Sequence, residues 1–95
     1  MWYSARVLFR CEVEGDKRKR VLFEETVFLL RAYYEEEARK TALSIARKKQ
    51  HSYSNCYKER VRWRFHRLLE VLQLIDQRLM PGAEVYWRLF KKHRR

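Results

Sequence analysis

Hydrophobic and polar residues alternate through the first stretch of the chain, from Trp2 to Val13. Apolar residues occupy every second position there: Tyr3, Ala5, Val7, Phe9, Cys11 and Val13. The positions between them are mostly polar, with Trp2 and Leu8 as the apolar exceptions. A period of two predicts a strand with one buried face. Glu14-Gly15-Asp16 follows, and because Gly15 can adopt the positive φ of a hairpin, the chain is expected to reverse there.

A second strand is predicted from Val21 to Ala32, which is rich in Val, Phe, Leu and Thr. Its apolar positions change parity around Glu24-Glu25, which indicates a β-bulge. The uninterrupted apolar run from Val27 to Leu30 would bury both faces of this strand. We therefore expect it to be a central strand of the sheet.

The clearest helix signal runs from Glu35 to Lys49. Small and apolar residues form one stripe at helical spacing: Ala38, Ala42, Ile45 and Ala46. Three glutamates occupy its first turn and three basic residues its last, which complements the helix dipole at both ends. The stripe predicts a helix that approaches a sheet closely.

The stretch from Arg60 to Ile75 fits two templates. As a strand, it alternates apolar residues with Arg62, Arg64 and His66. As a helix, it forms a stripe at spacings of three and four, made of Val61, Phe65, Leu68, Leu72, Ile75 and Leu79. Periodicity alone leaves both conformations open.

The remaining segments are shorter. Residues 50–57 are polar and turn-like, with a short extended segment at their start, and Pro81-Gly82 indicates a loop. Ala83 to Phe90 alternates again, with Val85, Trp87 and Leu89 on one face, and predicts a last strand. We expect a single domain over residues 1–90 and a loose basic tail over residues 91–95.

The chain has an unusual charge for its 95 residues. Lys and Arg number 23 against 12 Asp and Glu, a net charge of +11. This excess favours a polyanionic partner such as nucleic acid, an acidic protein or an anionic membrane surface. No signal peptide and no apolar run of about 20 residues is present, so we expect a cytoplasmic protein without membrane insertion. Two cysteines are too few for a disulfide framework.

Several short motifs together resemble a bacterial family catalogued as domain of unknown function 4288. They are, in chain order, Trp2-Tyr3-Ser4-Ala5-Arg6, Leu22-Phe23-Glu24-Glu25, Glu35-Glu36-Glu37-Ala38, Val61-Arg62-Trp63-Arg64-Phe65 and Glu84-Val85-Tyr86. The resemblance implies an α+β fold in which Arg60 to Ile75 is a strand. It offers no catalytic residue. Tyr34 stands where the family usually has a serine that caps the helix, and Trp87 stands at a position that is often serine.

The pattern and the resemblance together predict an α+β fold, an antiparallel sheet of about four strands with one helix packed on one face. The other face would be rich in arginine and could contact nucleic-acid phosphates, with Trp2, Tyr57 or Tyr86 stacking on unpaired bases. The candidate binding residues are Arg6, Arg10, Arg62, Arg64, His66, Arg88, Lys91, Lys92, Arg94 and Arg95. A purely structural interpretation has equal support. In it, the arginines pair across strands with Glu12, Glu14, Glu70 or Glu84.

Other functions have weaker support. The same charges suit a protein-interaction module, antitoxin-like or immunity-type, that binds an acidic protein surface. The open face or an edge of the sheet could also pair two copies and bury Trp2 and Leu8. No glycine-rich phosphate loop, nucleophile elbow or catalytic triad is present, and His51 with Cys56 lacks the spacing of zinc ligands. We expect no enzymatic activity, no cofactor and no metal.

Overall fold

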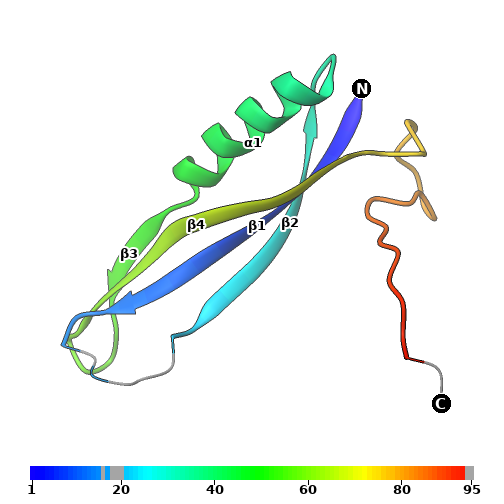
Figure 1. The fold of residues 1–95 in the computed structure, drawn as a ribbon. Helices are drawn as coiled ribbons and strands as arrows, with labels where there is room; N and C mark the ends of the chain where they lie inside the picture. The colour runs from blue at the N-terminus through cyan, green and yellow to red at the C-terminus, as the bar shows by residue number, and fades with distance from the viewer. Residues whose placement is uncertain (16, 18–20, 94–95) are drawn as a thin grey trace.

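The computed structural model describes residues 1–15, 17 and 21–93. Its elements in chain order are β1 (Trp2–Val13), β2 (Phe23–Arg31), α1 (Glu35–Lys48), β3 (His51–Ser54) and β4 (Arg60–Gln73). The four strands form one antiparallel sheet in the order β2-β1-β4-β3, and α1 packs on one side of it (Figure 1). The predicted α+β fold is confirmed, and most of Arg60 to Ile75 is a strand.

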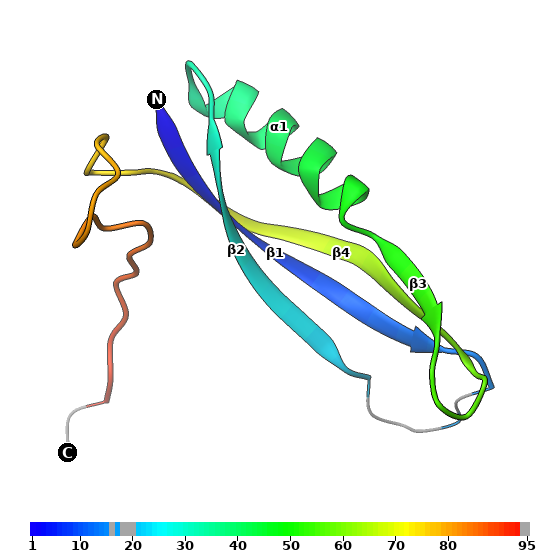
Figure 2. The ribbon, with the colours of Figure 1, turned by 180° about the vertical axis from the view of Figure 1, so that it is seen from behind.

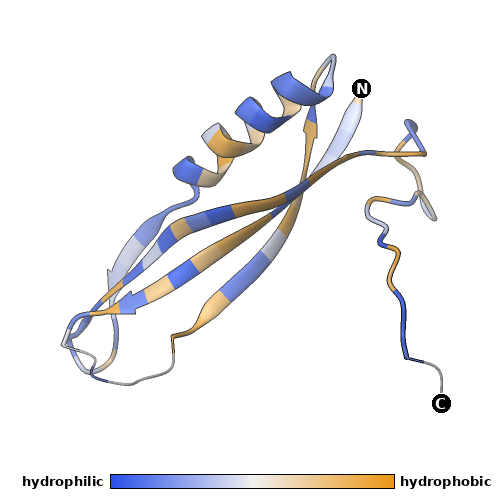
Figure 3. Ribbon diagram, viewed as in Figure 1, coloured by the Kyte–Doolittle hydropathy of each residue, from blue (hydrophilic) through white to orange (hydrophobic). Residues whose placement is uncertain are grey.

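Strand β1 lies inside the sheet, and its alternation defines two faces. The face under α1, here called the helix face, contains the apolar row that begins with Tyr3, Ala5 and Val7. Ala5 lies opposite Phe28 of β2 and Val71 of β4, so the three strands add to the same apolar layer. The alternation is visible as bands of colour along the strands in Figure 3.

Helix α1 approaches this layer through alanines. Ala38, Ala42 and Ala46 are fully buried and lie one helical turn apart. Because an alanine side chain is a single methyl group, the helix backbone can lie close to the strands. Phe28 and Leu68 contact both buried clusters and join them into one core.

Two expectations about the sheet are wrong. β2 is an outer strand and not a central one, since only β1 pairs with it. β2 also contains no bulge, because its register with β1 is unbroken from Arg31 to Phe23. The irregularities lie in β4, where His66 and Leu69 are the extra residues at two register shifts opposite β1. The change of parity in β2 reflects a strand whose two faces are both partly apolar.

The last predicted strand, Ala83 to Phe90, is also wrong, because these residues form no strand. The fourth strand is β3, where only a short extended segment was expected. The Gln77 side chain makes two hydrogen bonds to the backbone of Trp2: it accepts one from the Trp2 N–H at 2.7 Å and donates one to the Trp2 C=O at 3.2 Å. It also donates a hydrogen bond to the Leu74 carbonyl. These bonds anchor the chain where it leaves β4, so that it passes over the sheet instead of joining an edge.

Residues 76–93, here called the C-terminal segment, lie on the opposite side of the sheet from α1 (Figures 1 and 2). The Arg6 guanidinium lies 5.9 Å from the centre of the Tyr86 ring, which fixes the position of the segment. Arg94 and Arg95, and all of the basic turn at 17–20 except Lys17, fall outside the described residues. Gly15 has φ +77°, as the predicted hairpin turn requires. No helix in the described part of the chain is long and apolar enough to cross a bilayer.

The amino end of α1 lacks a side-chain cap. Tyr34 occupies the cap position with an extended backbone at φ −154°, and its side chain makes no capping hydrogen bond. Three residues later, Glu37 already reaches back and accepts a hydrogen bond from the Tyr33 N–H at 3.3 Å. This N–H lies one residue before the cap residue whose N–H a capping box uses, so neither half of a capping box is formed.

We expect Tyr34→Ser to raise the free energy of unfolding by about 1 kcal/mol, because a serine hydroxyl can accept from a free N–H of the first turn. Tyr34 is 58% exposed, so little packing is lost. Urea unfolding measures the change. Tyr33→Ser is the matched control, since Tyr33 is 83% exposed and lies one residue before the cap. Equal effects of the two substitutions would contradict the capping explanation.

Candidate nucleic-acid interface

The face of the sheet away from α1, here called the open face, contains six arginines and three glutamates. The strand register places on it Arg6, Arg10 and Glu12 from β1, Glu25 and Arg31 from β2, and Arg62, Arg64, Arg67 and Glu70 from β4. Their side chains share the face because residues directly opposite each other in neighbouring strands point the same way. The predicted arginine-rich face is thus formed by three strands.

Arg6 lies between two glutamates. Its guanidinium is 3.0 Å from the Glu25 carboxylate and 3.3 Å from that of Glu70, and its side chain is only 20% exposed. The hydrogen bond to Glu25 raises the pKa of Arg6 above its ordinary value, burial opposes this rise, and Glu70 adds to it. Arg6 therefore stabilises the sheet, as the structural interpretation expected.

The other arginines gather at the end of the sheet near Val13. Arg10 lies directly opposite Arg64, and Arg62 and Arg67 lie on the same face of β4. We call Arg10, Arg62, Arg64 and Arg67 the arginine cluster; all four are exposed. Of the acids that the structure describes, Glu12 lies 3.5 Å from the Arg64 guanidinium, and Glu14 lines a hollow together with Arg62. Like charges directly opposite in a sheet are destabilising, and a bound anion would remove that cost.

His66 and Arg67 owe their positions to a bulge. His66 is the extra residue between the pairs Leu8–Arg67 and Phe9–Phe65, and its ring contacts that of Phe23 at 5.2 Å. Simple alternation would have put Arg67 on the helix face, which is why sequence reasoning missed it. The Leu68-Leu69 pair, which interrupts the alternation of β4, was the available signal.

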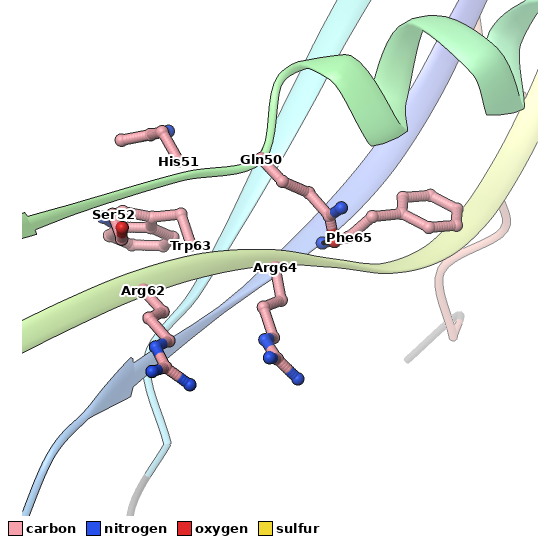
Figure 4. Close-up of a pocket in the computed structure, with 7 residues that line it drawn as sticks. All are labelled: Gln50, His51, Ser52, Arg62, Trp63, Arg64 and Phe65. Atoms are coloured by element: carbon pink, nitrogen blue, oxygen red, sulfur yellow. Dashed lines mark hydrogen bonds between the residues drawn. The ribbon is translucent and has the colours of Figure 1, made fainter.

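A shallow hollow of about 530 Å³ adjoins the cluster at the junction of β3 and β4. It is lined by Gln50, His51, Ser52, Arg62, Trp63, Arg64 and Phe65 (Figure 4). Arg62 and Arg64 point to one side of β4, while Trp63 and Phe65 point to the other. The Gln50 side chain accepts a hydrogen bond from the Phe65 N–H at 2.9 Å, which fixes the start of β3 against β4.

Aromatic rings border this hollow on the helix side. His51 and Tyr53 are exposed and stack on each other with ring centres 6.1 Å apart. The rings suggested from the sequence lie elsewhere. The Arg31 guanidinium covers the Trp2 ring at 5.3 Å, Tyr86 faces Arg6, and Tyr57 is exposed in the turn after β3.

The remaining candidate residues belong to the C-terminal segment. Arg88 lies over the ring of Phe90 at 5.1 Å, and Lys91 and Lys92 are exposed. The C-terminal segment that contains them lies on the side of the sheet away from α1 (Figure 1). Among residues 1–15, 17 and 21–93, no group of three or more side chains is arranged to hold a metal ion.

Arg6 should differ from the cluster in what its removal does to stability. We expect Arg6→Met to lower the free energy of unfolding by roughly 1 to 2 kcal/mol, because Glu25 and Glu70 lose a shared, partly buried partner. Arg62→Met on the same face should change it by less than about 0.5 kcal/mol. Urea unfolding of both variants is the measurement. Equal losses would contradict the separate role of Arg6.

Comparison with known proteins agrees with the resemblance in the sequence. A family model described as a domain of unknown function (DUF4288) matches residues 2–87, which span every strand and the helix. No curated protein and no solved structure matches the chain. The chain belongs to the DUF4288 family of proteins of unknown function.

Proposed function

We propose that this protein is a small, non-enzymatic binding protein that contacts nucleic-acid phosphates through the arginine cluster. The observation that supports this most directly is the pairing of Arg10 with Arg64 on an exposed face, with Arg62 and Arg67 close by. Among the described residues, Glu12 pairs with Arg64 and Glu14 lines a hollow with Arg62, so the four arginines outnumber these two acids. The net charge of +11 adds a long-range attraction to any polyanion.

The geometry suits a linear chain of phosphates. Arg62 and Arg64 are two residues apart on one strand, or about 6.8 Å along it. Arg10 extends the row sideways onto β1. Each guanidinium can donate two parallel hydrogen bonds to a phosphate. Lys91 and Lys92 of the C-terminal segment could add contacts to phosphates further along, as could Arg94 and Arg95.

The exposed aromatic rings of β3 lie on the helix face, around the sheet edge from Arg62 and Arg64, and a flexible single strand can bend around this edge to reach both where a stiff duplex cannot. His51 and Tyr53 are exposed, and unstacked bases bind to such rings with little dependence on sequence. We therefore expect single-stranded RNA or DNA to bind more tightly than a duplex of equal length. The proposal includes a cytoplasmic location, where the thiols of Cys11 and Cys56, both free in the structure, would remain reduced.

A second candidate is a protein-interaction module that binds an acidic protein surface. Phe23 and Leu8 lie beside Arg10 on the open face, and aromatic residues next to arginine are typical of protein interfaces. Pull-down from nuclease-treated lysate separates the two candidates. A protein that binds in stoichiometric amount after nuclease treatment favours this module, and loss of all bound material favours nucleic acid.

We expect Arg62→Glu combined with Arg64→Glu to weaken binding of a short single-stranded oligonucleotide at least tenfold. Fluorescence anisotropy over a salt series is the measurement. The slope of log affinity against log salt should become shallower by about 1.4, because two phosphate contacts to a single strand are lost. Far-UV circular dichroism verifies that the variant is folded.

The control is Arg39→Glu combined with Arg47→Glu, which makes the same change of net charge on exposed positions of α1. This variant should lose much less affinity, because the substituted residues are on the other side of the sheet. If both double variants lose affinity equally, binding depends on net charge and not on the cluster. Unchanged affinity in the folded Arg62→Glu, Arg64→Glu protein would contradict the proposal.

A further inference from the structure

The middle of the outer edge of β2 lacks the features that protect sheet edges from other strands. From Thr26 to Leu30 the sequence contains no charged residue, proline or glycine, and the register of β2 with β1 is regular throughout. Val27 is 43% exposed and Leu29 is 37% exposed, both on the open face. Natural proteins usually place charges, proline or bulges on such an edge, so an unprotected one indicates a binding surface for another strand.

The backbone groups that point outward can be identified from the bonds to β1. Leu22 accepts from the Cys11 N–H, and Ala32 donates to the Met1 carbonyl. Even-numbered residues of β2 therefore bond toward β1, since the direction alternates along a strand. The N–H and C=O groups of Glu25, Val27, Leu29 and Arg31 point to the outer edge.

We propose that this edge binds the same edge of a second copy of the chain, so that the two β2 strands run antiparallel about a two-fold axis at Phe28. Val27 then lies opposite Leu29 of the second copy, which joins the exposed apolar side chains. Glu25 lies opposite Arg31 of the second copy, which joins opposite charges. In both pairs the backbone N–H and C=O groups of the two residues point toward the other copy. The pairs can therefore be hydrogen-bonded pairs of an antiparallel ladder.

A second copy fits this edge better than an unrelated strand because the sequence is complementary to itself. A two-fold interface contains each contact twice, so one register makes two apolar pairs and two ion pairs. α1 packs more on β4 than on β2, which leaves the helix side of this edge accessible. The opposite edge of the sheet is less suited, because β3 has four residues and β4 is interrupted by its two bulges.

The pairing has a consequence that rests on the proposed function. A two-fold axis between antiparallel strands is perpendicular to the sheet, so both open faces would lie on one side of a continuous sheet. The two arginine clusters would then bind one polyanion at two places, and its apparent affinity would exceed that of a single cluster. The assembly itself is tested without nucleic acid, so its failure and that of the proposed function are distinguishable.

The first test is the molar mass of purified, nuclease-treated protein at about 0.3 M salt, where charge attraction to residual polyanions is largely screened. Sedimentation velocity should give twice the chain mass of 11.9 kDa at micromolar concentration. Leu29→Lys should give the monomer mass. Leu89→Lys is the matched control, because Leu89 is 87% exposed on the C-terminal segment, and this variant should remain dimeric.

The second test uses charge reversal to check the register. Glu25→Arg alone places arginine against Arg31 of the second copy and also beside Arg6 of its own chain, so circular dichroism must first verify that it is folded. Arg31→Glu alone places glutamate against glutamate. Each variant should dimerise at least tenfold more weakly than the original protein. An equal mixture of the two should recover dimers, because each copy then supplies the charge that the other lacks. Native mass spectrometry identifies such mixed dimers by mass.

Three results would overturn the proposal: a wild-type protein that is monomeric at 100 µM, a Leu29→Lys variant that is as dimeric as Leu89→Lys, or folded charge variants whose mixture dimerises no better than each alone. The first would leave the edge to a strand from another protein. The second and third would assign self-association to another surface.

Discussion

The pairing of β1 on both of its sides is the constraint on which the rest of the structure depends. From Tyr3 to Arg10 it pairs with β2 and with β4 at once, so its alternation is imposed on both neighbours. Tyr3, Ala5 and Val7 face α1 and begin the core, while Arg6 and Arg10 necessarily face the other way. The open face acquires its charge because the helix face must be apolar.

Local patterns predicted what local interactions decide. The first strand, the turn at Gly15 and the helix follow from periodicity, glycine and charge at the helix ends, and the structure has all three. The position of β2 at the edge of the sheet was not predictable in this way. An apolar run is expected in a central strand, but it also occurs in an edge strand whose two faces are both partly apolar. The strand expected at Ala83 to Phe90 failed for a similar reason. Its alternation is genuine, but Gln77 anchors the preceding turn to Trp2 and directs the segment away from the edges.

The bulges in β4 limit what alternation can say about the candidate site. Up to Phe65 the strand alternates, and Arg62 and Arg64 fall on the open face as expected. The extra residue His66 then reverses the parity, so that Arg67 joins the arginines and Leu68 joins the core. One inserted residue therefore adds a charge to the open face and an apolar side chain to the helix face. Neither position is predicted by a strict alternation of side chains between the two faces.

Arg6 and Arg10 show why a strongly positive net charge does not by itself locate a binding site. They lie four residues apart on the same face of the same strand, yet their neighbours differ completely. Arg6 lies between Glu25 and Glu70 under Tyr86, close to Ser4, whose buried hydroxyl finds no hydrogen-bond partner among the described residues. Arg10 lies opposite Arg64 and beside the ring of Phe23.

The open face is thus divided into two ends with different physical roles. Near Trp2, Arg6 is paired with Glu25 and Glu70, the Tyr86 ring lies against Arg6, and Gln77 bonds the Trp2 backbone, so that end holds the chain together. Near Val13 the positive charges repel one another, and folding brings them together at a cost in free energy. Such an arrangement costs stability, and that cost is the physical ground for the proposal that an anion binds there. The side chains of β2 and β4, and not the sequence of β1, decide which end of the face has paired charges and which has clustered arginines.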